Sequence, residues 1–189
     1  TLYAHWVNNA YMVQYKANTP ANASSSVLNI PANAVYSYDT AVTLGNAPTL
    51  AGWTFGGWYR DAACTVKVGD AGEVIANANL TTEPNETVQL FAKWTANTYT
   101  VTLDANGGVA GESTITVSYD GTYLNLPDNP IRTDYIFLGW KIEGTSTIVS
   151  SGSKVTTEND HTLVAQWTRV KATASGYSNM RVERGDVVT

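Results

Sequence analysis

Apolar and polar residues alternate strictly along several stretches of this chain, which is the pattern of a β-strand with one buried face. In segment 11–17 the odd positions are apolar or aromatic, whereas Met12, Gln14 and Lys16 fall on the other face. Segment 99–105 repeats the alternation with a more polar second face. We therefore predict a half-buried strand in each segment.

Two further segments, 90–94 and 163–167, alternate in the same way and each ends on a tryptophan. In both segments the leucine, the alanine and the tryptophan point in one direction, which predicts that Trp94 and Trp167 are buried. Truncating either indole should then cost roughly 3 to 5 kcal/mol, as in other buried aromatic truncations.

A third kind of segment is apolar on both faces. Around Phe137 the pattern "DYIFLGWK" leaves no polar face, which predicts a strand covered on both sides. Gly57 and Gly139 each stand directly before a tryptophan. We expect a bulge at both glycines that re-aims the indole.

These segments recur in a fixed order, so the chain contains internal repeats. The motifs "LYAHW", "LFAKWT" and "LVAQWT" end near Trp6, Trp94 and Trp167, and "GWTFGGWY" matches "DYIFLGWK". The spacing suits a small domain that closes its own core.

The repeats predict four parts. Residues 1–7 are the last strand of a preceding repeat, residues 8–95 form the first repeat and residues 96–168 form the second repeat. Residues 169–189 are a non-repeat tail or the start of another module, and we expect the whole to be a fragment of a longer protein. Only "TAN" at 95–97 joins the repeats, which favours a stiff array over a flexible string.

The first repeat is the longer one, because it carries "TPANASSSVLNIPANA" at 19–34 and a second insertion before its last strand. We expect both insertions at the surface, where function is often found.

Taken together, "YTVTLDANGG", "SYDG", "GWTFGGWYRDAAC" and "LFAKWT" resemble the Listeria-Bacteroides repeat family, which is related to the B-repeats of internalins. The resemblance implies a mainly β fold, α+β at most, made of tandem small β-grasp-like (ubiquitin-like) domains with mixed sheets. It also implies a spacer or adhesion module of secreted, wall-attached bacterial proteins, with no catalytic residues. The first repeat departs from the family pattern, because "YKANTPANAS" replaces the Asn-Gly-Gly turn.

Composition supports a folded chain and restricts its partners. Of the 189 residues 43% are hydrophobic and 14% are charged, and the net charge is −5. An acidic chain lacks the basic surface that nucleic acid and anionic lipid require. No apolar run approaches the ~20 residues of a membrane span, so we expect no membrane insertion. We expect a monomer that contacts adjacent repeats of its own chain.

Candidate chemistry is sparse, and we predict no enzyme, no cofactor and no metal site. His5 occupies an outward slot, and His161 sits in the turn-like "ENDHT" without a nucleophile motif nearby. Cys64 is the single cysteine. It excludes an internal disulfide and should be a free, partly buried thiol.

The aromatic block at 53–59 has two interpretations, a sugar-stacking platform or a piece of core. Its recurrence beside alternating strands favours core, with Tyr59 exposed because its counterpart is Lys141. Three hypotheses follow: a stalk of an extracellular bacterial surface protein, an accessory domain of a large secreted hydrolase, or a module that binds a host protein or glycan. The possible ligand surface for the last is Tyr59, Tyr36 and Tyr123.

Overall fold

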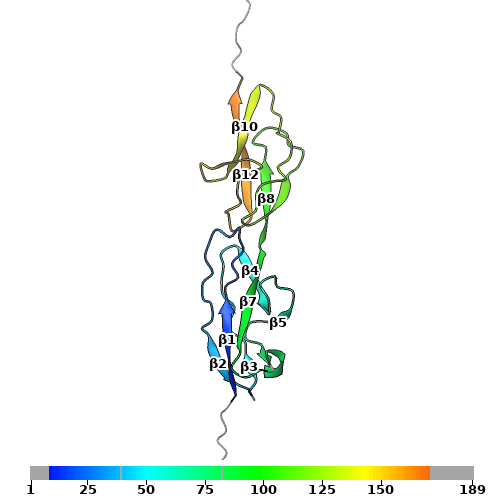
Figure 1. Cartoon of the computed structure of the whole chain (residues 1–189). Coiled ribbons are helices and arrows are strands. Elements are labelled where there is room, and N and C mark those ends of the chain that lie inside the picture. Colours follow the sequence, from blue (N-terminus) through cyan, green and yellow to red (C-terminus); the bar gives the residue numbers. More distant parts are fainter. Residues whose placement is uncertain (1–8, 39, 82, 171–189) are drawn as a thin grey trace, which may run out of the picture.

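The computed structural model describes residues 9–38, 40–81 and 83–170, and it contains two five-stranded sheets that lie end to end (Figure 1). The first sheet has the order β2 (Ala34–Ser37), β1 (Ala10–Lys16), β7 (Thr87–Ala96), β4 (Trp53–Tyr59), β5 (Lys67–Gly69). The second has the order β9 (Thr114–Ser118), β8 (Thr98–Asp104), β12 (His161–Arg169), β10 (Tyr135–Ile142), β11 (Ile148–Val149).

The two sheets have the same topology. In each, the first and last long strands are parallel neighbours at the centre, β1 with β7 and β8 with β12, and the remaining pairs are antiparallel. The prediction of a mainly β chain with mixed sheets is therefore confirmed. Short pieces complete the first repeat, namely the antiparallel pair β3 (Val42–Thr43) and β6 (Val74–Ile75) and the 3₁₀ turn η1 (Asn77–Asn79).

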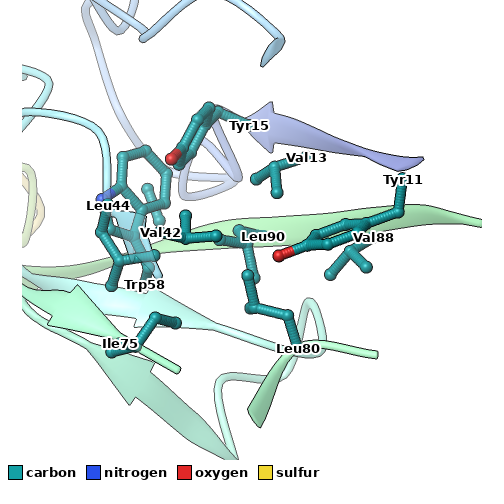
Figure 2. Packing of buried hydrophobic residues seen from close by; sticks show 11 residues of the cluster. Tyr11, Val13, Tyr15, Val42, Leu44, Trp58, Ile75, Leu80, Val88 and Leu90 are labelled. Atoms are coloured by element: carbon teal, nitrogen blue, oxygen red, sulfur yellow. The ribbon is translucent and has the colours of Figure 1, made fainter. Parts of the chain in front are cut away.

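Each sheet buries one face under its own loops, as the alternation predicts. In β1 the side chains of Tyr11, Val13 and Tyr15 are buried, and the residues between them are only partly buried. Figure 2 shows these side chains with Val42, Leu44, Trp58, Ile75, Leu80, Val88 and Leu90 in one cluster. A separate cluster in the second repeat is built around Val101, Tyr123, Trp140 and Leu163.

A triad of aromatic rings marks the same place in both repeats. Phe55 packs edge-on against Trp58 and Trp94, with ring centroids 5.1 and 5.8 Å apart. Phe137 packs in the same way against Trp140 and Trp167, at 5.5 Å from each. The aromatic block at 53–59 is therefore core, since Trp58 is fully buried.

The bulges predicted before the two tryptophans are present. The β4–β7 register shifts between Phe55 and Trp58, and Gly57 has φ +109°. The β10–β12 register shifts between Phe137 and Gly139, and Gly139 has φ +135°. The bulge places each indole on the same side of the sheet as the preceding phenylalanine. A residue other than glycine at the bulge would strain the backbone, because its φ is positive.

Two burial predictions are wrong. Trp94 and Trp167 are only partly buried, because each stands near the end of its strand. Each indole packs on the core phenylalanine of its repeat, and its Nε1 donates to Ala17 O or Ala105 O. The segment around Phe137 is not covered on both sides, since Ile136 and Leu138 are 55% and 59% exposed. No layer of the described chain covers that outer face of β10.

The departure of the first repeat from the Asn-Gly-Gly turn changes the turn itself, since Pro20 cannot donate as Gly108 N does to Ala105 O, but it keeps the contact of the asparagine. Asn18 and Asn106 both adopt positive φ, at 46° and 48°, and their side-chain amides donate to Ala92 O and Ala165 O at 3.0 Å. The asparagine that ties the first strand to the last is thus the shared element, and the glycines that follow it in the second repeat are not required.

We predict that Trp58→Ala lowers the free energy of unfolding of the first repeat by about 3–5 kcal/mol, because it leaves a cavity and strands the carbonyl of Gly45, to which the indole donates at 3.0 Å. Urea unfolding measures the loss. Val35→Ala is the control, since Val35 is 70% exposed and should change stability by no more than about 0.5 kcal/mol. Equal effects of the two substitutions would contradict the core assignment.

Candidate functional site

The most developed polar site of the described chain is the junction between the repeats. A single residue, Asn97, separates β7 from β8. Its backbone N–H donates to Gly52 O at 2.9 Å, and its carbonyl accepts from the backbone N–H of Tyr119 at 2.8 Å. Thr54 Oγ1 lies 2.6 Å from its side-chain Oδ1. The linker is thus bonded to both repeats at once.

A tyrosine ring of the second repeat packs against a glycine of the first repeat. Gly52 has φ +73°, and a Cβ placed on it would lie 2.1 Å from Cδ1 of the Tyr119 ring. The ring therefore packs directly on the glycine backbone, and its side chain is 4% exposed. A residue larger than glycine has no room at this position.

The carboxylate of Asp120 is the centre of the junction. Asp120 lies in the turn after β9 with φ +56°, and its side chain is 0% exposed. Its oxygens accept from the Ser24 backbone N–H at 3.0 Å, from Trp53 Nε1 at 3.1 Å and from the Ser24 hydroxyl. Lys154 Nζ forms an ion pair with it at 2.9 Å. Three of these four donors come from the first repeat, two from Ser24 and one from Trp53, and the fourth comes from Lys154 of the second repeat.

The environment of Asp120 strongly favours its charged form. Burial alone raises the pKa of a carboxyl group, but the hydrogen bonds from Ser24, Lys154 and Trp53 outweigh it and hold the pKa of Asp120 at about 2. A buried charge costs stability unless it is fully paired, and here the partners come from both repeats. The junction is therefore a specific contact that requires both.

The insertion at 19–34 explains how the first repeat reaches the second. After β1 the chain rises along the first sheet to the base of the second (Figure 1). There Ser24 binds Asp120, and the carbonyl of Asn22 accepts from Lys154 Nζ at 2.8 Å. The insertion lies at the surface, as predicted, and it is also part of the junction.

The far end of the second repeat has the same backbone arrangement with a different side chain. Val170 N donates to Asp134 O at 2.8 Å, as Asn97 N donates to Gly52 O. Asp134 has φ +62°, so it stands where the first repeat has its glycine. Asp134 therefore carries a Cβ at the position where Gly52 leaves room for the Tyr119 ring.

The three tyrosines proposed as a ligand surface do not form an exposed patch. Tyr59 is 8% exposed and Tyr123 is fully buried, while Tyr36 is partly buried beside Tyr11. The expectation that Tyr59 is exposed is wrong, because its ring packs at the end of β4 with Lys93 Nζ 5.0 Å from its centroid. Tyr123 fills the second core, and its hydroxyl lies 2.8 Å from His161 Nε2.

The remaining candidate residues form no site within the described ranges. His161 begins β12 and bonds Tyr123, whereas His5 lies outside the described residues. Cys64 is a free, partly buried thiol, as predicted, and burial raises its pKa. Residues 9–38, 40–81 and 83–170 contain no group of three or more potential metal ligands, and no helix there has the length and apolar character to cross a membrane.

We predict that Gly52→Ala destabilises the protein by about 1–3 kcal/mol more than Gly72→Ala in urea unfolding. Both glycines have φ +73°, but a Cβ on Gly72 meets nothing within 4 Å, so the pair separates backbone strain from the clash with Tyr119. Equal losses in the two variants would show that the Tyr119 ring does not depend on the glycine.

We predict that the junction is lost only in strong acid. Because the pKa of folded Asp120 is about 2 and that of an unfolded aspartate is near 3.9, the carboxylate contributes about 2–3 kcal/mol at neutral pH. This contribution disappears as the pH falls from 4 toward 2. The Trp53 indole N–H resonance reports the contact in an NMR titration. In Asp120→Asn it should already be shifted at pH 7, and a wild-type midpoint near 4 would refute the assignment.

Comparison with known proteins places the chain among bacterial repeat proteins. It is 32% identical over 167 residues to a protein of Evansella cellulosilytica named as a Gly-rich membrane protein, covering 88% of this chain and 17% of that protein. A second protein of that organism, named as a membrane protein, is 30% identical over 88% of this chain and 22% of its own length. Internalin H of Listeria monocytogenes is 35% identical over 69% of this chain and 23% of its own length.

The chain thus spans less than a quarter of the length of these relatives. The family match is more extensive, since the Listeria-Bacteroides repeat domain matches residues 11–93 and again residues 99–166. These two segments coincide with the two sheets and with the motifs identified in the sequence. The chain therefore belongs to the Listeria-Bacteroides repeat family, a repeat-domain family of bacterial surface and membrane proteins.

Proposed function

We propose that this chain is a stiff, non-catalytic spacer section in the extracellular part of a bacterial surface protein. The observation that carries the proposal is the buried Asp120 carboxylate, whose partners Ser24 and Trp53 belong to the neighbouring repeat. A flexible string of domains has no need for a buried charge shared between units. A stalk does, because its reach depends on fixed angles between its domains.

The linker supports the same function. One residue joins β7 to β8, and its backbone N–H and C=O are both bonded, so the chain has little freedom to bend at this point. The parallel pairing of first and last strands brings the chain in at one end of each sheet and out at the other. Each added repeat then lengthens the molecule.

We further propose that each repeat, with the boundaries 8–95 and 96–168, is a β-grasp-like domain. The support is the strand order, in which the first and last strands are parallel at the centre of a five-stranded mixed sheet. Loops and one short 3₁₀ turn, rather than an α-helix, connect these strands in the described ranges.

The location at the cell surface is proposed from the relatives. Two of them are named as membrane proteins and one as an internalin. Attachment to the cell wall would then depend on parts of the parent protein other than these repeats. A role in adhesion fits the same picture if the spacer presents another module.

The alternative of an accessory domain in a secreted hydrolase would be decided by the neighbouring domains of the parent chain. The hypothesis of a ligand surface on Tyr59, Tyr36 and Tyr123 has lost its support, since they form no exposed patch.

Distance measurements between spin labels test the spacer function. We propose labels on Val66→Cys and Thr116→Cys, two exposed positions in different repeats, in a Cys64→Ser background. We expect one narrow distance distribution for the wild-type junction. Asp120→Asn should broaden it, because it removes the charge that Lys154 and Ser24 bind.

The control is Asp128→Asn, which removes a carboxylate of the second repeat that lies in the loop before β10 and outside the junction contacts. Its distribution should match that of the wild type. A broad wild-type distribution would show two domains that move independently and would contradict a stiff spacer.

A further inference from the structure

The second repeat has an open sheet edge beside a groove. Strand β11 pairs only with Trp140 and Lys141, so β10 from Tyr135 to Gly139 has no strand neighbour on that side within the described chain. A groove of about 400 Å³ lies along this edge. Its walls include Leu126, Pro127, Leu138, Ile148, Ser150 and Ser151, and no charged residue lines it.

A buried hydrogen-bond donor at this groove has no partner. Trp140 lines the groove and is 2% exposed, yet its indole Nε1 makes no hydrogen bond. In the first repeat the equivalent Trp58 Nε1 donates to Gly45 O at 3.0 Å. Gly45 belongs to the loop before β4, and the corresponding loop before β10 contributes Leu126, Pro127 and Asn129 to the groove wall. The unpaired N–H therefore belongs to a residue that lines the groove, and leaving it unpaired costs stability.

The first repeat closes the same place with an aromatic side chain. Tyr15 packs on Trp58 with ring centroids 4.6 Å apart, and its hydroxyl accepts from Gly45 N at 2.8 Å. The register of the repeats places Leu103 at this position in the second. The smaller side chain and its lack of a hydroxyl leave the loop without that anchor.

The ion pair beside the bulge of the first repeat has no counterpart beside the bulge of the second repeat in the described chain. Lys67 and Asp70 form an ion pair at 2.7 Å. A Cβ placed on Gly57 would lie 2.7 Å from Lys67 Cε, so the lysine stem covers the bulge. In the second repeat Ile148 takes the place of the lysine, since a Cβ placed on Gly139 would lie 3.1 Å from Ile148 Cγ2. Ser150 follows β11 as Asp70 follows β5. Charged side chains on a sheet edge discourage pairing with another strand, and here they are replaced by an apolar and a neutral residue.

We propose that this edge of the second repeat binds an extended, uncharged peptide segment of a partner protein. The segment pairs with β10 beyond the end of β11 and places a bulky apolar side chain against Leu138 and Ile148, which are 59% and 51% exposed. One of its carbonyls accepts from Trp140 Nε1, which is covered in the free protein, so the groove wall must open for this bond to form. A glycan is the less suitable ligand, because the Trp140 ring is buried and offers no face for a sugar to stack on.

The first test selects peptides on the 189-residue chain. A library of random heptapeptides is displayed and panned against the wild type, with Ile148→Lys/Ser150→Asp as the counter-selection target. The double variant installs the charges of the first repeat at two exposed positions, so it should fold normally. We expect enriched peptides that lack charged residues and carry an apolar residue flanked by β-formers. Failure to enrich any peptide that distinguishes the two targets would overturn the proposal.

The second test locates the bound peptide by NMR, with the enriched peptide as the titrant. We expect saturable shifts of the Trp140 indole N–H and of amides from Phe137 to Gly139, with no shift of the Trp58 indole. Trp140→Phe assigns the resonance and should weaken binding about fivefold, the value of one hydrogen bond. In Lys67→Ile/Asp70→Ser the first repeat should still bind no peptide, because Tyr15 and Gly45 fill its groove.

Three results would count against the site. Shifts that centre on residues elsewhere, equal affinity in Ile148→Lys/Ser150→Asp, or the same shifts on addition of a neutral oligosaccharide each contradict a peptide site at this edge. Shifts that appear on concentrating the protein alone would assign the edge to a second copy of the chain and would also overturn the proposal.

Discussion

The parallel pairing of the first and last strands in each sheet is the constraint on which the rest of the structure depends. Two parallel neighbours must start at the same end of the sheet, so everything between β1 and β7, or between β8 and β12, has to return the chain to that end. The returning segments cover one sheet face and supply its core. Since the last strand leaves at the end opposite to where the first entered, the next repeat continues in the same direction.

The junction uses this geometry. The short connection through Asn97 brings the turn after β9 against the end of the first repeat, where Gly52 and Trp53 open strand β4. Apolar contact alone would allow the two sheets to slide or rotate. A buried carboxylate with directional donors from two repeats tolerates far less displacement, because each lost hydrogen bond leaves part of a buried charge unpaired.

The sequence predicted the interior of each repeat better than the contact between them. Alternation placed Tyr11, Val13 and Tyr15 on the buried face, and the repeated glycines placed the bulges, because both signals are local. The contact of Ser24 with Asp120 spans 96 positions and joins an insertion to a turn, so no periodic pattern carries it.

The errors also have physical causes. Comparing Tyr59 with Lys141 suggested an exposed position, but the same position can hold a buried ring or a long side chain whose charge reaches solvent. The pattern around Phe137 appeared apolar on both faces of the strand. The bulge at Gly139, however, places Trp140 on the same side of the sheet as Phe137 and leaves Leu138 exposed on the other side. A one-residue change in register is invisible to a strict period of two.

The division of the junction across two repeats affects how such arrays can evolve. Gly52 and Ser24 make their contacts only when the next domain supplies a tyrosine and an aspartate. The second repeat has Asp134 in place of the glycine, so it lacks the contact surface that Gly52 offers to a tyrosine ring. The heritable unit that keeps a joint intact is therefore half of one domain plus half of the next. Recombination with breakpoints inside the sheets preserves such joints, whereas exchange of whole domains at their boundaries separates the matched halves.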